Sequence, residues 1–137
     1  MKRLPTLLLV HIVWSTARRR ADLPPTLDAP LAELLGAKGA ELGCPLLATG
    51  AADDHVHAIV RLAPTVCLAA LVQRLKGASA PALNERRWVP EGFRWQSGYW
   101  AESLSPSALS RLEAYVRGQR RHHDDAHPAE DWLRRLA

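Results

Sequence analysis

The strongest constraint on the fold of this chain is a pair of short apolar runs on either side of two aspartates. Pro45 to Ala51 and His55 to Leu62 have the length of strands, and Asp53-Asp54 lies between them. A short polar link between two such runs is typical of a β-hairpin. The chain is therefore expected to contain an antiparallel sheet with an acidic turn.

Further strand patterns occur near the N-terminus and after the middle of the chain. Leu7 to Ser15 is an apolar, β-branched run that ends at three arginines, which indicates a buried strand. Phe93 to Leu104 is aromatic and is interrupted by Gly98, so we expect a bent strand or two short strands there. Trp14 and Trp95 are expected in the core.

Helical patterns separate these strands. Asp28 to Leu42 has apolar residues at helical spacing, and a second helix is expected from the Thr65 cap to Gly77, where glycine ends it. Ser79 to Arg86 is expected to form another short helical turn. Ser105-Pro106 predicts the start of a helix that runs to about His123, and the pattern of Trp132, Leu133 and Leu136 favours a short final helix docked on the body.

The order strand, helix, strand, strand, helix, strand, helix predicts an α+β fold, a ferredoxin-like antiparallel sheet with helices packed on it. A chain of 137 residues with 47% hydrophobic residues suits one compact domain, here residues 1–137. The fragment Gly36-Ala37-Lys38-Gly39 resembles a phosphate loop, but it lies inside a predicted helix and lacks the P-loop spacing. No nucleotide cofactor is therefore expected.

Charge and cysteine content indicate the partners and the compartment. The formal net charge is +4, with 15 arginines against 3 lysines, and guanidinium groups suit phosphate oxygens, so nucleic acid is a reasonable partner. Cys44 and Cys67 are too few and too far apart to staple the chain, which favours a reduced cytoplasmic setting. The apolar N-terminal run resembles a signal peptide, but the interruption at His11 favours a strand. No stretch is long enough to span a bilayer, so no membrane partner is expected.

The most informative chemistry lies in His55-Val56-His57. Alternation along a strand places both imidazoles on one face and Val56 on the other, and two imidazoles so placed can chelate one cation. The same tripeptide also fits two half-exposed histidines with ordinary hydrogen bonds.

A further candidate ligand and a candidate nucleophile lie on the last long helix. Tyr115 and Gln119 are four residues apart and so share a helix face. An isolated tyrosine at such a position also fits a core aromatic with a solvated hydroxyl. His122 and His123 follow and fit either proton transfer or solvated positions near a helix C-terminus, so they are left out of the catalytic set.

Five short segments, spread along nearly the whole chain, form a recognisable set: His11-Ile12-Val13-Trp14, Asp54-His55-Val56-His57-Ala58-Ile59-Val60, Leu75-Lys76-Gly77-Ala78-Ser79, Trp95-Gln96-Ser97-Gly98-Tyr99 and Tyr115-Val116-Arg117-Gly118-Gln119. In this order they resemble the opening strand, the DHVH strand, the LKGxS segment, the WQxGY strand and the YIxxQ helix of IS200-type and REP-associated tyrosine transposases, single-tyrosine enzymes of the HUH class. Pro81-Ala82 and the tail from His127-Pro128 depart from the family pattern.

The resemblance implies a metal-dependent enzyme that cleaves and rejoins hairpin-bearing single-stranded DNA through a 5′-phosphotyrosine intermediate, with Tyr115 as the nucleophile. It implies that His55, His57 and Gln119 bind a divalent metal, Mg²⁺ or Mn²⁺. It also implies a homodimer in which the tyrosine helix of one subunit completes the site of the other.

Phosphate contacts are expected from the clustered arginines, namely Arg18, Arg19, Arg20, Arg86, Arg87, Arg117, Arg120 and Arg121. Trp88, Trp95 and Trp100 are candidates for stacking on unpaired bases. Two alternatives remain open: a non-catalytic, regulatory protein of the same fold that binds DNA hairpins, and a small metal-binding or oligomeric protein without a nucleic-acid role.

Overall fold

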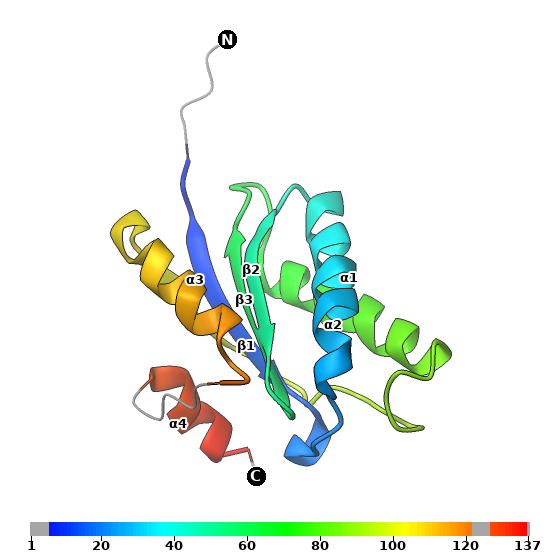
Figure 1. Ribbon diagram of the computed structural model, residues 1–137. Helices are drawn as coiled ribbons and strands as arrows, with labels where there is room; N and C mark the ends of the chain where they lie inside the picture. The colour runs from blue at the N-terminus through cyan, green and yellow to red at the C-terminus, as the bar shows by residue number, and fades with distance from the viewer. Residues whose placement is uncertain (1–5, 122–126, 137) are drawn as a thin grey trace.

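A four-stranded antiparallel sheet forms the centre of the molecule (Figure 1), in a computed structural model that describes residues 6–121 and 127–136. The strands are β1 (Leu9–Ser15), β2 (Leu46–Ala51), β3 (His55–Arg61) and β4 (Trp100–Leu104), and their order across the sheet is β2-β3-β1-β4. The predicted hairpin is confirmed as β2 and β3, which pair in antiparallel register.

Helices cover both faces of this sheet. On one side lie α1 (Asp28–Glu41) and α2 (Leu68–Glu85), and on the other lie α3 (Leu109–Arg117) and α4 (Pro128–Arg134), as Figure 1 shows. Short 3-10 turns at Ala17–Arg19, Pro25–Leu27 and Pro106–Ala108 connect the larger elements. The predicted α+β class, with helices packed on an antiparallel sheet, is confirmed. No helix among the described residues combines the length and the hydropathy needed to cross a bilayer.

Alternation along β1 and β3 divides the sheet into two chemically different faces. The even-numbered residues of both strands, with Trp14 and Val56 among them, pack into the main apolar core with the inner sides of α1 and α2. On the other face, Val13 packs against α4 and Ile59 packs against α3. The histidines of β3 lie on this second face, which keeps them out of the main core.

The second helix is longer than the sequence predicts. We expected it to end at Gly77, but α2 continues to Glu85 through both Gly77 and Pro81. Leu71, Leu75, Ser79 and Leu83 are buried and share one side of the helix, so stopping at Gly77 would expose Leu83. The burial of Leu83 contributes about 2 kcal/mol, and the Trp95 indole that donates to Ser79 adds to it. Both offset the cost of placing Gly77 and Pro81 within the helix.

The third helix is shorter than predicted, since α3 ends at Arg117 instead of continuing toward His123. Gly118 stands at its C-cap, and a glycine there favours termination. Its start is also different, because a 3-10 turn precedes it and the Ser105 hydroxyl contacts the Ser107 hydroxyl instead of capping the backbone. The short final helix is confirmed as α4, in which Leu133 is buried.

Two of the sequence motifs contact each other and clamp the segment that leads into β4. The Lys76 ammonium donates to the carbonyl oxygens of Gln96 and Gly98, at 2.6 and 2.8 Å, and the Trp95 indole donates to the Ser79 hydroxyl at 2.9 Å. Burial lowers the pKa of Lys76. Trp14 and Trp95 are buried as predicted, and their rings meet edge to face. These motifs hold the fold together behind the sheet.

Gly50 in β2 lets α3 approach the sheet closely. It pairs with His57 of β3, and a Cβ at this position would overlap the carbonyl oxygen of Val116 in α3. Val116 is fully buried one residue after Tyr115, so the missing side chain at Gly50 sets how near the tyrosine helix lies to the histidines.

We therefore predict that Gly50→Ala lowers the free energy of unfolding by about 2 kcal/mol, because α3 must shift away from β2. The matched control is Gly36→Ala, which meets open space within α1 and should raise the free energy of unfolding by about 0.5 kcal/mol. Urea denaturation followed by circular dichroism measures both variants. A Gly50→Ala protein as stable as the wild type would contradict this packing.

Candidate metal centre and tyrosine site

Two buried histidines of β3 form the base of the candidate site. His55 is 2% exposed and His57 is fully buried, and both lie on the sheet face that α3 and α4 cover. Their rings meet edge to face with centroids 5.1 Å apart. The prediction that the two imidazoles share one face is confirmed, whereas the alternative of half-exposed side chains is not.

An acidic side chain orients the first imidazole. Nδ1 of His55 lies 2.7 Å from a carboxylate oxygen of Asp54, whose other oxygen lies 3.0 Å from the Arg19 guanidinium. Burial raises the pKa of Asp54, but the hydrogen bond to His55 and the charges of His55 and Arg19 outweigh it, so the net pKa is lowered. Asp54 is thus held ionised and accepts the Nδ1 proton, which leaves Nε2 of His55 directed into the site.

A third histidine, His11 of β1, orients the second imidazole. Its Nε2 lies 2.9 Å from Nδ1 of His57, and the two rings stack. Burial, assisted by the charge of His127, lowers the pKa of His11 to about 3, and burial with neighbouring histidines lowers the pKa of His57 well below its usual value. Both rings are therefore neutral at physiological pH. In the sequence, His11 is a polar interruption of an apolar strand and the first residue of the opening-strand segment, and neither feature predicts that it orients His57.

Gln119 reaches the site from the turn after α3. Its side-chain oxygen lies 3.3 Å from Nε2 of His55, and its side-chain nitrogen donates to the Tyr115 carbonyl at 3.2 Å. The predicted proximity of Tyr115 and Gln119 is therefore present, although Gln119 follows the helix instead of continuing it.

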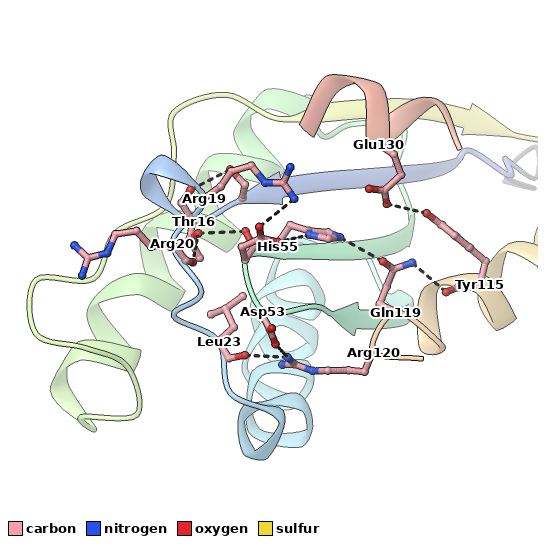
Figure 2. Close-up of polar contacts among 12 residues, drawn as sticks. Thr16, Arg19, Arg20, Leu23, Asp53, His55, Tyr115, Gln119, Arg120 and Glu130 are labelled. Carbon is pink, nitrogen blue, oxygen red and sulfur yellow. Dashed lines mark hydrogen bonds and ion pairs between the residues drawn. The ribbon is translucent and has the colours of Figure 1, made fainter. Parts of the chain in front are cut away.

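Glu130 of α4 is the member of the site to which no sequence motif points. It is 7% exposed, and one of its carboxylate oxygens lies within 4.8 Å of ligand nitrogens of both His55 and His57. The same carboxylate accepts a hydrogen bond from the Tyr115 hydroxyl at 3.2 Å. Figure 2 shows Glu130 and Gln119 approaching the histidine from two different elements. The position of Glu130 depends on how α4 packs against the sheet, and the spacing of residues along the sequence does not predict that packing.

The donor set fits a divalent cation. Nε2 of His57 is buried and has no hydrogen-bond partner among the described residues. Nε2 of His55 lies 3.3 Å from the Gln119 side-chain oxygen, so both atoms are directed at the same point. A cation satisfies these atoms and the Glu130 carboxylate together. Two imidazole nitrogens with carboxylate and amide oxygens suit Mn²⁺ or Mg²⁺.

Tyr115 lies directly beside this donor set. Its ring centroid is 5.5 Å from that of His57 and 4.9 Å from that of His127, on which it stacks. Tyr115 therefore lies beside the histidines of its own chain in this structure. The tyrosine is partly buried and packs against the smaller apolar cluster of Ala48, Ile59 and Val116, while its hydroxyl donates to Glu130.

The arginines expected to contact DNA differ in their surroundings. Arg120 is held by carboxylates of Asp28 and Asp53 and by the carbonyl oxygens of Leu23 and Pro24, which gives it a structural role; its contact with DNA stays a prediction. Arg117 donates to the Leu47 carbonyl, and Arg86 lies over the exposed ring of Trp88. Arg121 is exposed, while His122 and His123 lie outside the described residues.

A cavity of about 380 Å³ opens beside the donor set. It is lined by His55 and Gln119, by three arginines (Arg19, Arg120 and Arg134) and by three carboxylates (Asp53, Asp54 and Glu130). The cavity thus places three guanidinium groups beside the ligand atoms, and guanidinium groups suit the phosphate oxygens of a substrate.

Comparisons with known proteins agree with this geometry. A family model described as "Transposase IS200 like" matches residues 6–119. The ISDra2 transposase TnpA of Deinococcus radiodurans is 26% identical over 116 residues, which cover 80% of this chain and 81% of that protein.

Solved structures show the same fold. A candidate transposase of Deinococcus radiodurans R1, known from a crystal structure, superposes with a TM-score of 0.64 at 25% identity and covers 88% of this chain and 98% of its own. A REP-associated tyrosine transposase bound to a REP hairpin superposes with a TM-score of 0.61 at 14% identity, covering 85% and 68%.

We predict that Glu130→Gln weakens Mn²⁺ binding roughly tenfold, because the variant retains the shape of the side chain but loses the negative charge that faces two imidazoles. Titration of the protein with Mn²⁺, with free Mn²⁺ followed by electron paramagnetic resonance, measures the affinity. Glu85→Gln, at an exposed position at the end of α2, is the matched control and should bind as the wild type does. Equal affinities for all three proteins would remove Glu130 from the metal site.

Proposed function

We propose, because the chain belongs to the IS200-like transposase family, that it is a DNA transposase that cleaves and rejoins single-stranded DNA through Tyr115. The observation that carries this proposal is the convergence of four ligand side chains around the tyrosine. His55, His57, Gln119 and Glu130 meet in one buried cluster, and the Tyr115 hydroxyl donates to the last of them.

The geometry supports a direct displacement at phosphorus. The Tyr115 oxygen attacks the scissile phosphate, and the bond from phosphorus to the 3′-oxygen of the leaving strand breaks. The hydroxyl proton passes to the Glu130 carboxylate, which already accepts it in a hydrogen bond. The 3′-oxygen takes up a proton from solvent and leaves as a hydroxyl, and the phosphate remains attached to the tyrosine as a 5′-phosphotyrosine. Attack by another 3′-hydroxyl reverses the step and rejoins DNA without a nucleotide cofactor.

The cluster would hold a divalent metal through Nε2 of His55, Nε2 of His57 and the side-chain oxygens of Gln119 and Glu130. When bound, this metal supplies positive charge to the scissile phosphate as negative charge develops. The chain's own residues orient the ligand atoms. Asp54 and His11 hold the imidazoles of His55 and His57 by hydrogen bonds. The Gln119 side-chain nitrogen donates to the Tyr115 carbonyl, which turns the amide oxygen toward the cluster.

The substrate we propose is a hairpin-bearing single strand. One structural neighbour is described as bound to a REP hairpin, and this chain carries a net positive charge dominated by arginine. Arg18, Arg19, Arg20, Arg86, Arg87, Arg117, Arg120 and Arg121 remain the proposed DNA contacts. A homodimer is part of the same proposal, with Tyr115 acting on the site of its own subunit, as its contact with His57 supports.

We predict that Tyr115→Phe abolishes the covalent protein–DNA adduct formed with hairpin-bearing single strands in Mn²⁺ or Mg²⁺. The chain has two tyrosines, so Tyr99→Phe is the matched control and should form the adduct at the wild-type level. Denaturing gel electrophoresis with end-labelled DNA measures the adduct. Persistence of the adduct in Tyr115→Phe would overturn the assignment of the nucleophile.

His57→Ala separates cleavage from binding. It should abolish adduct formation while the affinity for the hairpin changes by less than about threefold. The affinity is expected to change little because the His57 side chain is fully buried and is not among the proposed DNA contacts. Electrophoretic mobility shift measures the affinity. Tight hairpin binding by the wild type without any adduct would instead indicate a non-catalytic binding protein.

A further inference from the structure

The turn that follows β1 separates two cavities. Arg19 and Ala21 line the cavity beside His55, whereas Arg18, Arg20 and Asp22 line a second cavity of about 190 Å³. Figure 2 shows Arg19 extending toward His55 and Arg20 extending away from it. One short stretch of arginines thus forms the wall between the metal site and a neighbouring cavity.

The second cavity has an excess of positive charge. Arg94, whose carbonyl oxygen accepts from the Ala17 amide, also lines it, so three guanidinium groups share the cavity with two carboxylates, those of Asp22 and Glu91. Arg20 and Asp22 lie 3.9 Å apart, and within residues 6–121 and 127–136 no ion pair involves Arg18 or Arg94. Two guanidinium groups therefore remain available for an anion from outside.

The backbone at these arginines is strained. Over the described parts of the chain, the non-glycine residues with positive φ are Arg18, Arg19 and Arg87, at 56°, 52° and 57°. Residues with a Cβ rarely adopt this conformation, and among them Asn, Asp and His are the common ones. Arg87 lines a further cavity that shares Glu91 and Gly92 with the second one. Strain confined to arginines that line cavities indicates that the guanidinium groups are needed there.

We propose that the cavity between Arg18, Arg20 and Arg94 binds a backbone phosphate of single-stranded DNA, at a nucleotide that flanks the scissile phosphate. This inference rests on the proposed function, since the same strand passes the metal site. The turn at Arg18 to Arg20 then contacts two phosphates of one strand. Arg19 contacts the phosphate on the side of the metal site, and Arg18 and Arg20 contact the phosphate in the second cavity. Guanidinium groups bind phosphate oxygens in pairs, which fixes the register of the strand across the turn.

Arg94 offers the cleanest test because it lies in an exposed loop, far along the chain from the metal ligands. The proteins carry Tyr115→Phe to prevent cleavage, and fluorescence anisotropy measures their binding to labelled oligothymidylates of increasing length over a range of salt concentrations. We expect Arg94→Ala to weaken binding about fivefold and to reduce the slope of log K against log salt by about 0.7, the value for one phosphate of a single strand. Arg94→Lys should retain most of the slope.

The matched control is Arg74→Ala, which removes an arginine of α2 that pairs with Glu41 and does not line the second cavity, and it should leave the slope unchanged. Equal slopes for Arg94→Ala and the wild type, with adduct formation by the wild type intact, would overturn this inference alone. A wild-type protein without salt-dependent affinity for any single strand would overturn the proposed function together with the inference.

Arg18→Gly provides an independent test in which stability and binding change in opposite directions. Glycine adopts the positive φ of this position without strain, so the melting temperature should rise by about 2 °C. The loss of the guanidinium group should weaken oligothymidylate binding about as much as Arg94→Ala does. Unchanged binding in a stabilised Arg18→Gly protein would contradict the proposal.

Discussion

The burial of three imidazoles on one face of the sheet is the constraint on which the rest of the site depends. His11, His55 and His57 are each at most 2% exposed, and burial lowers the pKa of His11 and of His57. Each buried ring needs partners that orient its two nitrogens. Asp54 and His11 do this from the protein side, and the nitrogens left over point at the carboxylate and amide oxygens of Glu130 and Gln119. A metal ion binds to nitrogen and oxygen atoms that carry no proton, and the cluster brings such ligand atoms together in one buried place.

The elements around this cluster are placed by packing rather than by local motifs. Gly50 lets α3 approach the sheet, and α4 docks through Ala129 and Leu133 against Val13. Behind the sheet, Lys76 and Ser79 fix the segment that enters β4. The motif residues of the sequence thus divide into two groups, one that supports the sheet from behind and one that lies at the donor set, and Tyr115 belongs to the second.

Sequence patterns predicted what depends on local periodicity. The hairpin, the shared face of His55 and His57, and the nearness of Tyr115 to Gln119 all follow from periods of two and four residues. Glu130 and His11 could not be found in this way, because their places depend on the docking of α4 and on the pairing of β1 with β3. The same limit explains the end of α2, where Gly77 predicts a stop but the burial of Leu83 favours a longer helix. It also explains the structural role of Arg120, whose partners lie more than 60 positions away in the sequence.

The most direct test of this account is an anomalous difference map from crystals soaked in Mn²⁺, with data collected at the manganese absorption edge. The account predicts one strong peak in contact with Nε2 of His55, Nε2 of His57 and the Glu130 carboxylate, beside the Tyr115 hydroxyl. A map without a peak at this cluster, or with manganese bound there by carboxylates alone, would contradict it.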